Sequence, residues 1–151
     1  MSLRFLEDFQ RGQVFTGGHH IVDARQIIAF AREFDPLPIH LDPDAASRSM
    51  FGSLIASGWH SVSLLHRLIV ENIVHDAELL GSPGVDRIEW VRPLRPGDAV
   101  SARVAVLEVR RSQSRPDRGI VKARNELLRD GVEVLVVLDS VAFYACQPAQ
   151  S

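Results

Sequence analysis

Residues 58–74, GWHSVSLLHRLIVENIV, decide the fold because they carry a helical pattern that is apolar around most of its circumference. The apolar positions recur at helical spacing and comprise Val62, Leu64, Leu65, Leu68, Ile69 and Ile73. A narrow polar strip remains, formed by His60, Ser63, Arg67 and Glu71. Such a helix has to be covered on nearly all sides, so the segment predicts a long, largely buried helix.

The sequence that follows this helix changes from a helical to an alternating pattern after GSPG. Apolar and charged residues alternate over 87–90, and apolar residues alternate again over 100–106, after the turn sequence RPGD. Two longer strands are predicted at 119–128 and 132–144, joined at the sequence RDG. Strands in succession without helices between them form an antiparallel sheet, so we expect an α+β fold whose sheet curls round the helix.

A shorter helix is predicted upstream, over residues 24–34. Asp23 followed three residues later by Gln26 is a capping-box sequence, and apolar residues recur at helical spacing behind it. Pro36 ends this helix, because its ring disfavours the helical conformation for Asp35. Asp35 should therefore lie just past the helix end.

The sequence FDPLPIHLDP, residues 34–43, links this helix to another short one. Asp42 and Pro43 have the residue types of an N-cap and a first helical position, which predicts a helix over 44–48. The link between the two helices is predicted to be non-helical.

Asp35 and His40 in this link are the candidate catalytic pair. A structural interpretation is open, with the acid capping a turn and the imidazole serving as a buried hydrogen-bond partner. The catalytic interpretation is favoured because both residues belong to one short segment whose prolines, Pro36 and Pro38, restrict the backbone as a pre-organised pair requires.

Gly58 marks a second candidate feature at the start of the long helix. A glycine there lets a ligand approach bare backbone N–H groups, whose partial positive charge suits a carbonyl oxygen gaining negative charge. The alternative is that Gly58 is only a permissive residue behind a capping Ser57. The local sequence supports both interpretations equally.

Composition excludes several classes of protein. The chain has 151 residues, 46% of them hydrophobic, which is typical of a single domain spanning 1–151. A net charge of -2 leaves no basic face for nucleic acid. The lone Cys146 cannot form an internal disulfide and no signal-peptide or membrane-spanning pattern is present, so we expect a cytoplasmic protein. His60 and His66 miss the helical spacing of a metal pair, and no metal site is predicted.

Several residues of the 34–43 segment match the signature of a known protein family. Asp35, Pro38, His40, Asp42 and Pro43 resemble the D-x-N-P-[apolar]-H-x-D-P signature of the MaoC-like dehydratases, also called (R)-specific enoyl-CoA hydratases. The resemblance continues through FGSLIASGWH, through RPLRPGD and into the N-terminal LEDFQRGQVF, so it covers nearly the whole chain.

This resemblance implies a hot-dog fold and a homodimer whose sheets join edge to edge, with acyl-CoA entering between the subunits. It implies reversible addition of water to a trans-2-enoyl-CoA to give a (3R)-3-hydroxyacyl-CoA, with no cofactor beyond the coenzyme A of the substrate. Asp35 and His40 would be catalytic. The residues expected at the oxyanion and substrate-binding positions are Ser57, Gly58, Trp59, Ser63 and His66.

The chain departs from the signature at one position that bears on the acid. Leu37 stands where the signature has asparagine, so an amide that could orient Asp35 is missing. Two alternatives to the hydratase remain open: a hot-dog acyl-CoA thioesterase that directs water at the thioester carbon, and a non-catalytic acyl-CoA-binding protein of the same fold.

Overall fold

A computed structural model of the chain describes residues 2–150. The predicted domain, 1–151, therefore has its two outermost residues outside the described range. The elements follow in the order η1 (Leu6–Asp8), β1 (Val14–Ile21), α1 (Ala24–Phe34), α2 (Pro38–Leu41), α3 (Pro43–Ser47), α4 (Gly58–Asn72), β2 (Leu79–Trp90), β3 (Ala99–Arg111), β4 (Arg118–Arg129) and β5 (Glu133–Ala145).

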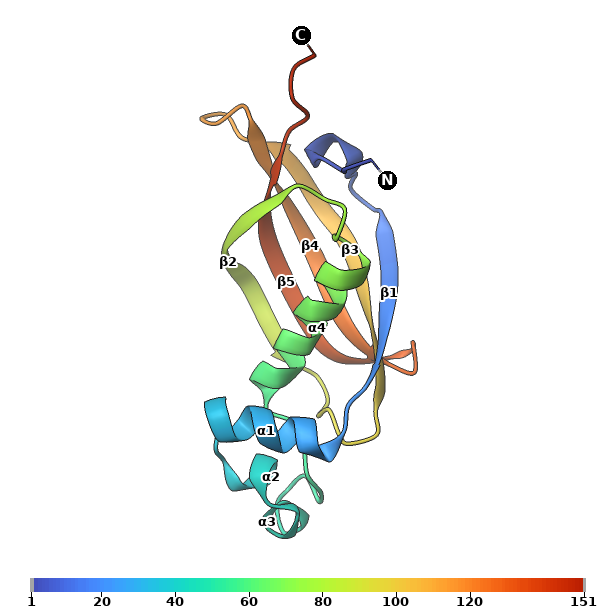
Figure 1. Cartoon of the computed structure of the whole chain (residues 1–151), viewed down its shortest axis with the longest axis vertical. Helices are drawn as coiled ribbons and strands as arrows, with labels where there is room; N and C mark the ends of the chain where they lie inside the picture. Colours follow the sequence, from blue (N-terminus) through green and yellow to red (C-terminus); the bar gives the residue numbers. More distant parts are fainter. Residues whose placement is uncertain (1, 151) are drawn as a thin grey trace.

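The five strands form one antiparallel sheet in the order β1-β3-β4-β5-β2, so β1 and β2 are its edges. The sheet curls round α4, which crosses its inner face, while α1, α2 and α3 gather at the end where α4 begins (Figure 1). The predicted α+β architecture of a sheet wrapped around a long helix is confirmed.

The core lies between α4 and the inner face of the sheet. Leu65 is fully buried, and Leu64 and Leu68 pack beside it against inward residues of the strands. Burial of each such side chain contributes about 1.5–3 kcal/mol. The alternation predicted for residues 100–106 is confirmed, because all four even-numbered residues of that stretch are buried.

Two local predictions were wrong. The link between α1 and α3 contains a helical turn, α2, in which Pro38 occupies the first position and its carbonyl accepts the N–H of Asp42. Proline is compatible with the first helical position because no hydrogen bond is required of its nitrogen there. The second error concerns β2, which begins at Leu79 and runs through the GSPG sequence.

The edge strand β2 is irregular where it contains GSPG. Its pairing with β5 shifts register three times between Leu79 and Arg87, and Gly81 and Gly84 have positive φ angles of 150° and 149°. An edge position tolerates Pro83 and such bulges, because one side of the strand has no partner strand within residues 2–150. Among residues 2–150, no helix is long and apolar enough to cross a membrane.

Candidate active site

The acid of the candidate pair, Asp35, is placed by the end of α1. The capping box of Asp23 and Gln26 starts this helix as predicted, and the N–H of Asp35 donates to the carbonyl of Ala31 as the C-cap. The side chain is mostly buried, with 22% of its surface exposed. Asp35 thus lies just past the helix end, turned toward the start of α4.

The imidazole of His40 belongs to α2, and each of its two ring nitrogens faces a polar group. Its Nδ1 lies 2.8 Å from the carbonyl oxygen of Ile55, and the N–H of Ile55 donates to the carbonyl of Ile39. A carbonyl only accepts, so Nδ1 carries a proton. The other nitrogen, Nε2, lies 3.4 Å from Oδ2 of Asp35. His40 is 5% exposed, so this geometry is fixed by packing as well as by the hydrogen bond.

Ser57 connects the acid to the long helix. Its hydroxyl donates to Oδ2 of Asp35 at 2.6 Å and accepts the N–H of Trp59 at 3.3 Å, which makes Ser57 the N-cap of α4. The side chain is fully buried. The hydrogen bond to Asp35 was not predicted. It gives the carboxylate an orienting donor. Leu37, at the position where the signature has asparagine, is half-exposed, and its side chain has no donor to offer.

Gly58 is required at the first turn of α4 by a contact with β2. A Cβ atom at this position would lie 2.4 Å from Nε1 of Trp90, so any side chain would collide with the indole. The N–H of Gly58 has no hydrogen-bond partner within residues 2–150. It remains available to a ligand oxygen at the positive end of the helix dipole.

The catalytic pair and Gly58 line one cavity of about 460 Å³, and Ser57 lies behind its wall. Asp35, His40 and Gly58 lie on its wall together with Trp59 and Ser61. Trp59 meets Trp90 edge to face, with ring centroids 5.3 Å apart, at the exposed side of the cavity. The structure therefore brings together the predicted pair, the predicted glycine and one predicted substrate-binding residue.

Two other predicted substrate-binding residues lie elsewhere. Ser63 is exposed, and its hydroxyl donates to the carbonyl of Trp59 within the helix. His66 lines a different cavity, between the second half of α4 and the sheet. A second buried serine at the candidate site, Ser61, lines the cavity and was not predicted. Its spacing of four residues from Ser57 places both on one helical face. Trp90 was also missed as a site residue.

His60 lies on α4 next to these residues but belongs to a separate cluster. Its ring stacks on Phe30 with centroids 4.7 Å apart, and its Nδ1 is buried without a hydrogen-bond partner in residues 2–150. Burial lowers the pKa of His60, and the nearby His20 and Arg67 lower it further. His60 is therefore favoured as a neutral ring. Within the described chain, no group of three or more His, Cys, Asp or Glu side chains is placed to hold a metal ion.

Comparisons with known proteins agree with this architecture. The MaoC-like dehydratase from Rhodospirillum rubrum is 37% identical and superposes with a TM-score of 0.86, over 97% of this chain and 99% of that one. The (R)-hydratase from A. caviae shares the fold at 24% identity and a TM-score of 0.68, over 90% and 97% of the two chains.

The sequence comparisons lead to the same group. Protein YdeM of Bacillus subtilis (strain 168), which is uncharacterized, is 30% identical over 103 residues, which are 68% of this chain and 73% of YdeM. The model of the MaoC like domain matches residues 10–127. The chain belongs to the MaoC-like dehydratase family and has its hot-dog fold.

Proposed function

We propose that this chain is a hydro-lyase that adds water reversibly to a trans-2-enoyl-CoA and forms a (3R)-3-hydroxyacyl-CoA. The observation that carries the proposal is the shared cavity, in which Nε2 of His40 and Oδ2 of Asp35 lie 3.4 Å apart beside the free N–H of Gly58. Membership of a dehydratase family supports this class of reaction. The substrate and its stereochemistry are our inference.

The reaction needs three contributions that these residues supply. A water molecule held between Asp35 and His40 loses one proton to the pair as its oxygen bonds to C3 of the enoyl group. The pair returns a proton to C2, so the product gains one water and no charge. During the reaction the thioester oxygen carries enolate charge, which the N–H of Gly58 stabilises.

A homodimer would complete the assembly. The edge strand β2 has an unpaired side and exposes Leu80, Val85 and Trp90. Pairing with a second copy of the same edge satisfies its backbone groups and covers these side chains. Two identical strands that pair about a two-fold axis run antiparallel. The start of α4 in one subunit would therefore lie at the same end of the dimer as the second half of α4 in its partner.

We also propose a cytoplasmic location, consistent with the single Cys146.

The test is hydration of crotonyl-CoA, followed by loss of the enoyl thioester absorbance. We expect Asp35→Asn and His40→Ala to lower kcat about a hundredfold to ten-thousandfold, because each removes a group that handles a proton. Asp44→Asn, an exposed carboxylate on α3, is the matched control and should keep its activity. Circular dichroism establishes that each variant is folded.

Three results would contradict the proposal. Folded Asp35 and His40 variants with unchanged rates would remove the pair from the mechanism. Release of free CoA from saturated acyl-CoA, without hydration of enoyl-CoA, would identify a thioesterase. Tight binding of acyl-CoA without turnover at any chain length would identify a binding protein.

A further inference from the structure

A second cavity lies between the second half of α4 and the inner face of the sheet. Its volume is about 360 Å³. Its walls are largely apolar and include Ile69, Val70, Ile73, Val104, Val106 and Val121. It shares no lining residue with the Asp35 and His40 cavity. The cavity reaches the surface at β2, where the lining residues Gly81, Ser82 and Val85 are exposed.

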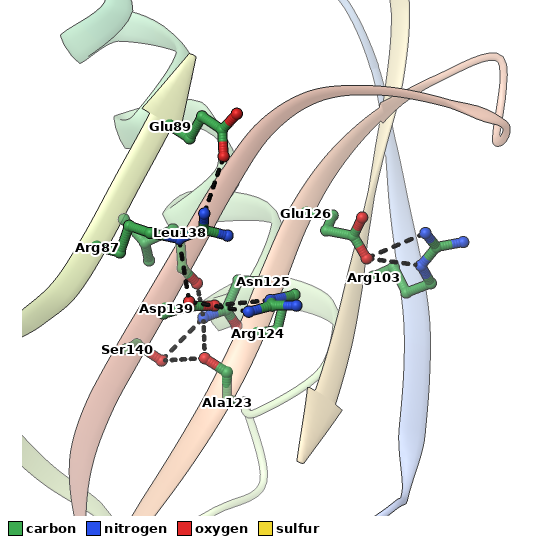
Figure 2. Close-up of polar contacts among 10 residues, drawn as sticks. All are labelled: Arg87, Glu89, Arg103, Ala123, Arg124, Asn125, Glu126, Leu138, Asp139 and Ser140. Carbon is green, nitrogen blue, oxygen red and sulfur yellow. Dashed lines mark hydrogen bonds and ion pairs between the residues drawn. The ribbon is translucent and has the colours of Figure 1, made fainter. Parts of the chain in front are cut away.

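Two polar residues, Asn125 on β4 and Ser140 on β5, interrupt the apolar inner face of the sheet at this cavity. Side chains alternate along β4, so Asn125 faces inward while its charged neighbours Arg124 and Glu126 face outward and pair with Asp139 and Arg103 (Figure 2). Asn125 is only 4% exposed. A buried amide at the centre of an apolar face is costly unless its groups find partners.

The amide of Asn125 has partners on one side only. Its Nδ2 donates to the carbonyl of Leu138 at 2.9 Å and to the hydroxyl of Ser140 at 2.8 Å, with a longer contact of 3.4 Å to the carbonyl of Ala123 (Figure 2). Exchanging the two ends of the amide would set Oδ1 against that carbonyl, so the hydrogen bonds fix the orientation. Oδ1 therefore points away from β5, and it has no hydrogen-bond partner within residues 2–150.

We propose that this cavity binds an apolar chain bearing a hydrogen-bond donor, such as a hydroxyl group, and that Oδ1 of Asn125 accepts the hydrogen bond. The walls of the cavity select the apolar part of the ligand. Oδ1 is an open acceptor on a largely apolar wall, and it favours a ligand with a donor, because a ligand without one would seal Oδ1 from water with no partner. Ser140 holds the amide in place through Nδ2 and leaves Oδ1 free.

The identity of the apolar chain as the acyl tail of a thioester rests on the proposed function. In the antiparallel dimer proposed above, the outer side of β2 at this cavity lies beside the first turn of the partner's α4. A tail-hydroxylated enoyl thioester is then the substrate class that would use both cavities. The proposal assigns the preference for a donor to Oδ1 of Asn125, which takes no part in the reaction, so it can be tested without catalysis.

The test compares n-hexanol with its isomer methyl n-pentyl ether, which has the same atoms but no donor. Binding to the full chain is titrated by NMR and followed at the methyl signals of Ile69 and Val121, which line the cavity and are present in every variant. We expect the alcohol to bind about two- to tenfold more tightly, which corresponds to one net hydrogen bond. In Asn125→Leu this preference should disappear. In Ser140→Ala it should persist, because Oδ1 is still present.

Asn72→Leu is the matched control, since it makes the same substitution on α4 at a residue that does not line the cavity. It should bind both probes as the wild type does. Equal affinities for the two probes in the wild type would overturn the proposal, as would an alcohol preference that survives in Asn125→Leu. The wild-type comparison is decisive even if the Asn125 variant does not fold. An inactive enzyme with a clear alcohol preference would contradict the proposed function and leave this inference standing.

Discussion

Replacing Ser57 by alanine tests whether one hydroxyl both caps α4 and orients the catalytic acid. The substitution removes the donor to Oδ2 of Asp35 and the acceptor for the N–H of Trp59. Loss of an N-cap costs about 1 kcal/mol. Loss of a hydrogen bond to a charged group costs about 1.5–3 kcal/mol, and the partial exposure of Asp35 places this case at the lower end. We expect the free energy of unfolding to fall by about 2.5 kcal/mol in total, which lowers Tm by about 5–10 °C.

The effect of this variant on catalysis should be larger than its effect on stability suggests. With the carboxylate no longer held, kcat for hydration of crotonyl-CoA should fall about tenfold to a hundredfold, while KM changes little. Asp23→Ala is the matched control, because Asp23 caps α1 in a comparable way and does not touch the site. It should lower Tm without lowering kcat. A kcat of the Ser57 variant within about twofold of the wild type, or an equal loss in the Asp23 variant, would refute the reasoning.

Two further predictions concern stability. The pKa of His60 is lowered in the folded protein, so the unfolded chain binds more protons below about pH 6.5 and stability falls as the pH decreases through that region. His60→Phe keeps the stacking on Phe30 and should flatten the dependence of Tm on pH between about pH 7 and pH 5. His75→Gln, which replaces an exposed histidine, is the control and should leave that dependence as steep as in the wild type. An equally steep dependence in His60→Phe would show that His60 is not its source. Gly58→Ala should cost about 1–3 kcal/mol in thermal or urea unfolding through its collision with Trp90. The double variant with Trp90→Val should recover part of that loss, and strictly additive losses would show that the collision is not the cause.

Much of the fold could be predicted because local signals and packing agree. The capping box at Asp23 and the apolar face of α4 gave elements that the structure confirms, and alternation gave the inner face of β3. The turn α2 was missed because Pro36 and Pro38 were interpreted as stiffening an extended link. Proline restricts a helix interior but not its first residue, and only the tertiary contacts of His40 show which case applies.

The candidate site was predictable where its residues are close in sequence and not where they come from separate elements. Asp35 and His40 lie in one segment, whereas Trp90 reaches Gly58 from the far end of β2. No local pattern indicates that approach. Ser57 was identified as a cap, but its second hydrogen bond depends on how α1 packs against α4. Asn125 left a visible signal, because it is a polar residue at the inward phase of an otherwise apolar alternation.

The interrupted pairing of β2 also affects how the protein fluctuates. Each register break leaves backbone groups outside the regular ladder, and Pro83 contributes no amide proton to it. We therefore expect the amides around Pro83 in β2 to exchange with deuterium through local opening, well before those of β4, whose pairing with β5 shifts register only once. Because Gly81, Ser82 and Val85 lie at the mouth of the Asn125 cavity, the same opening would widen the entrance to that cavity while the rest of the domain stays folded.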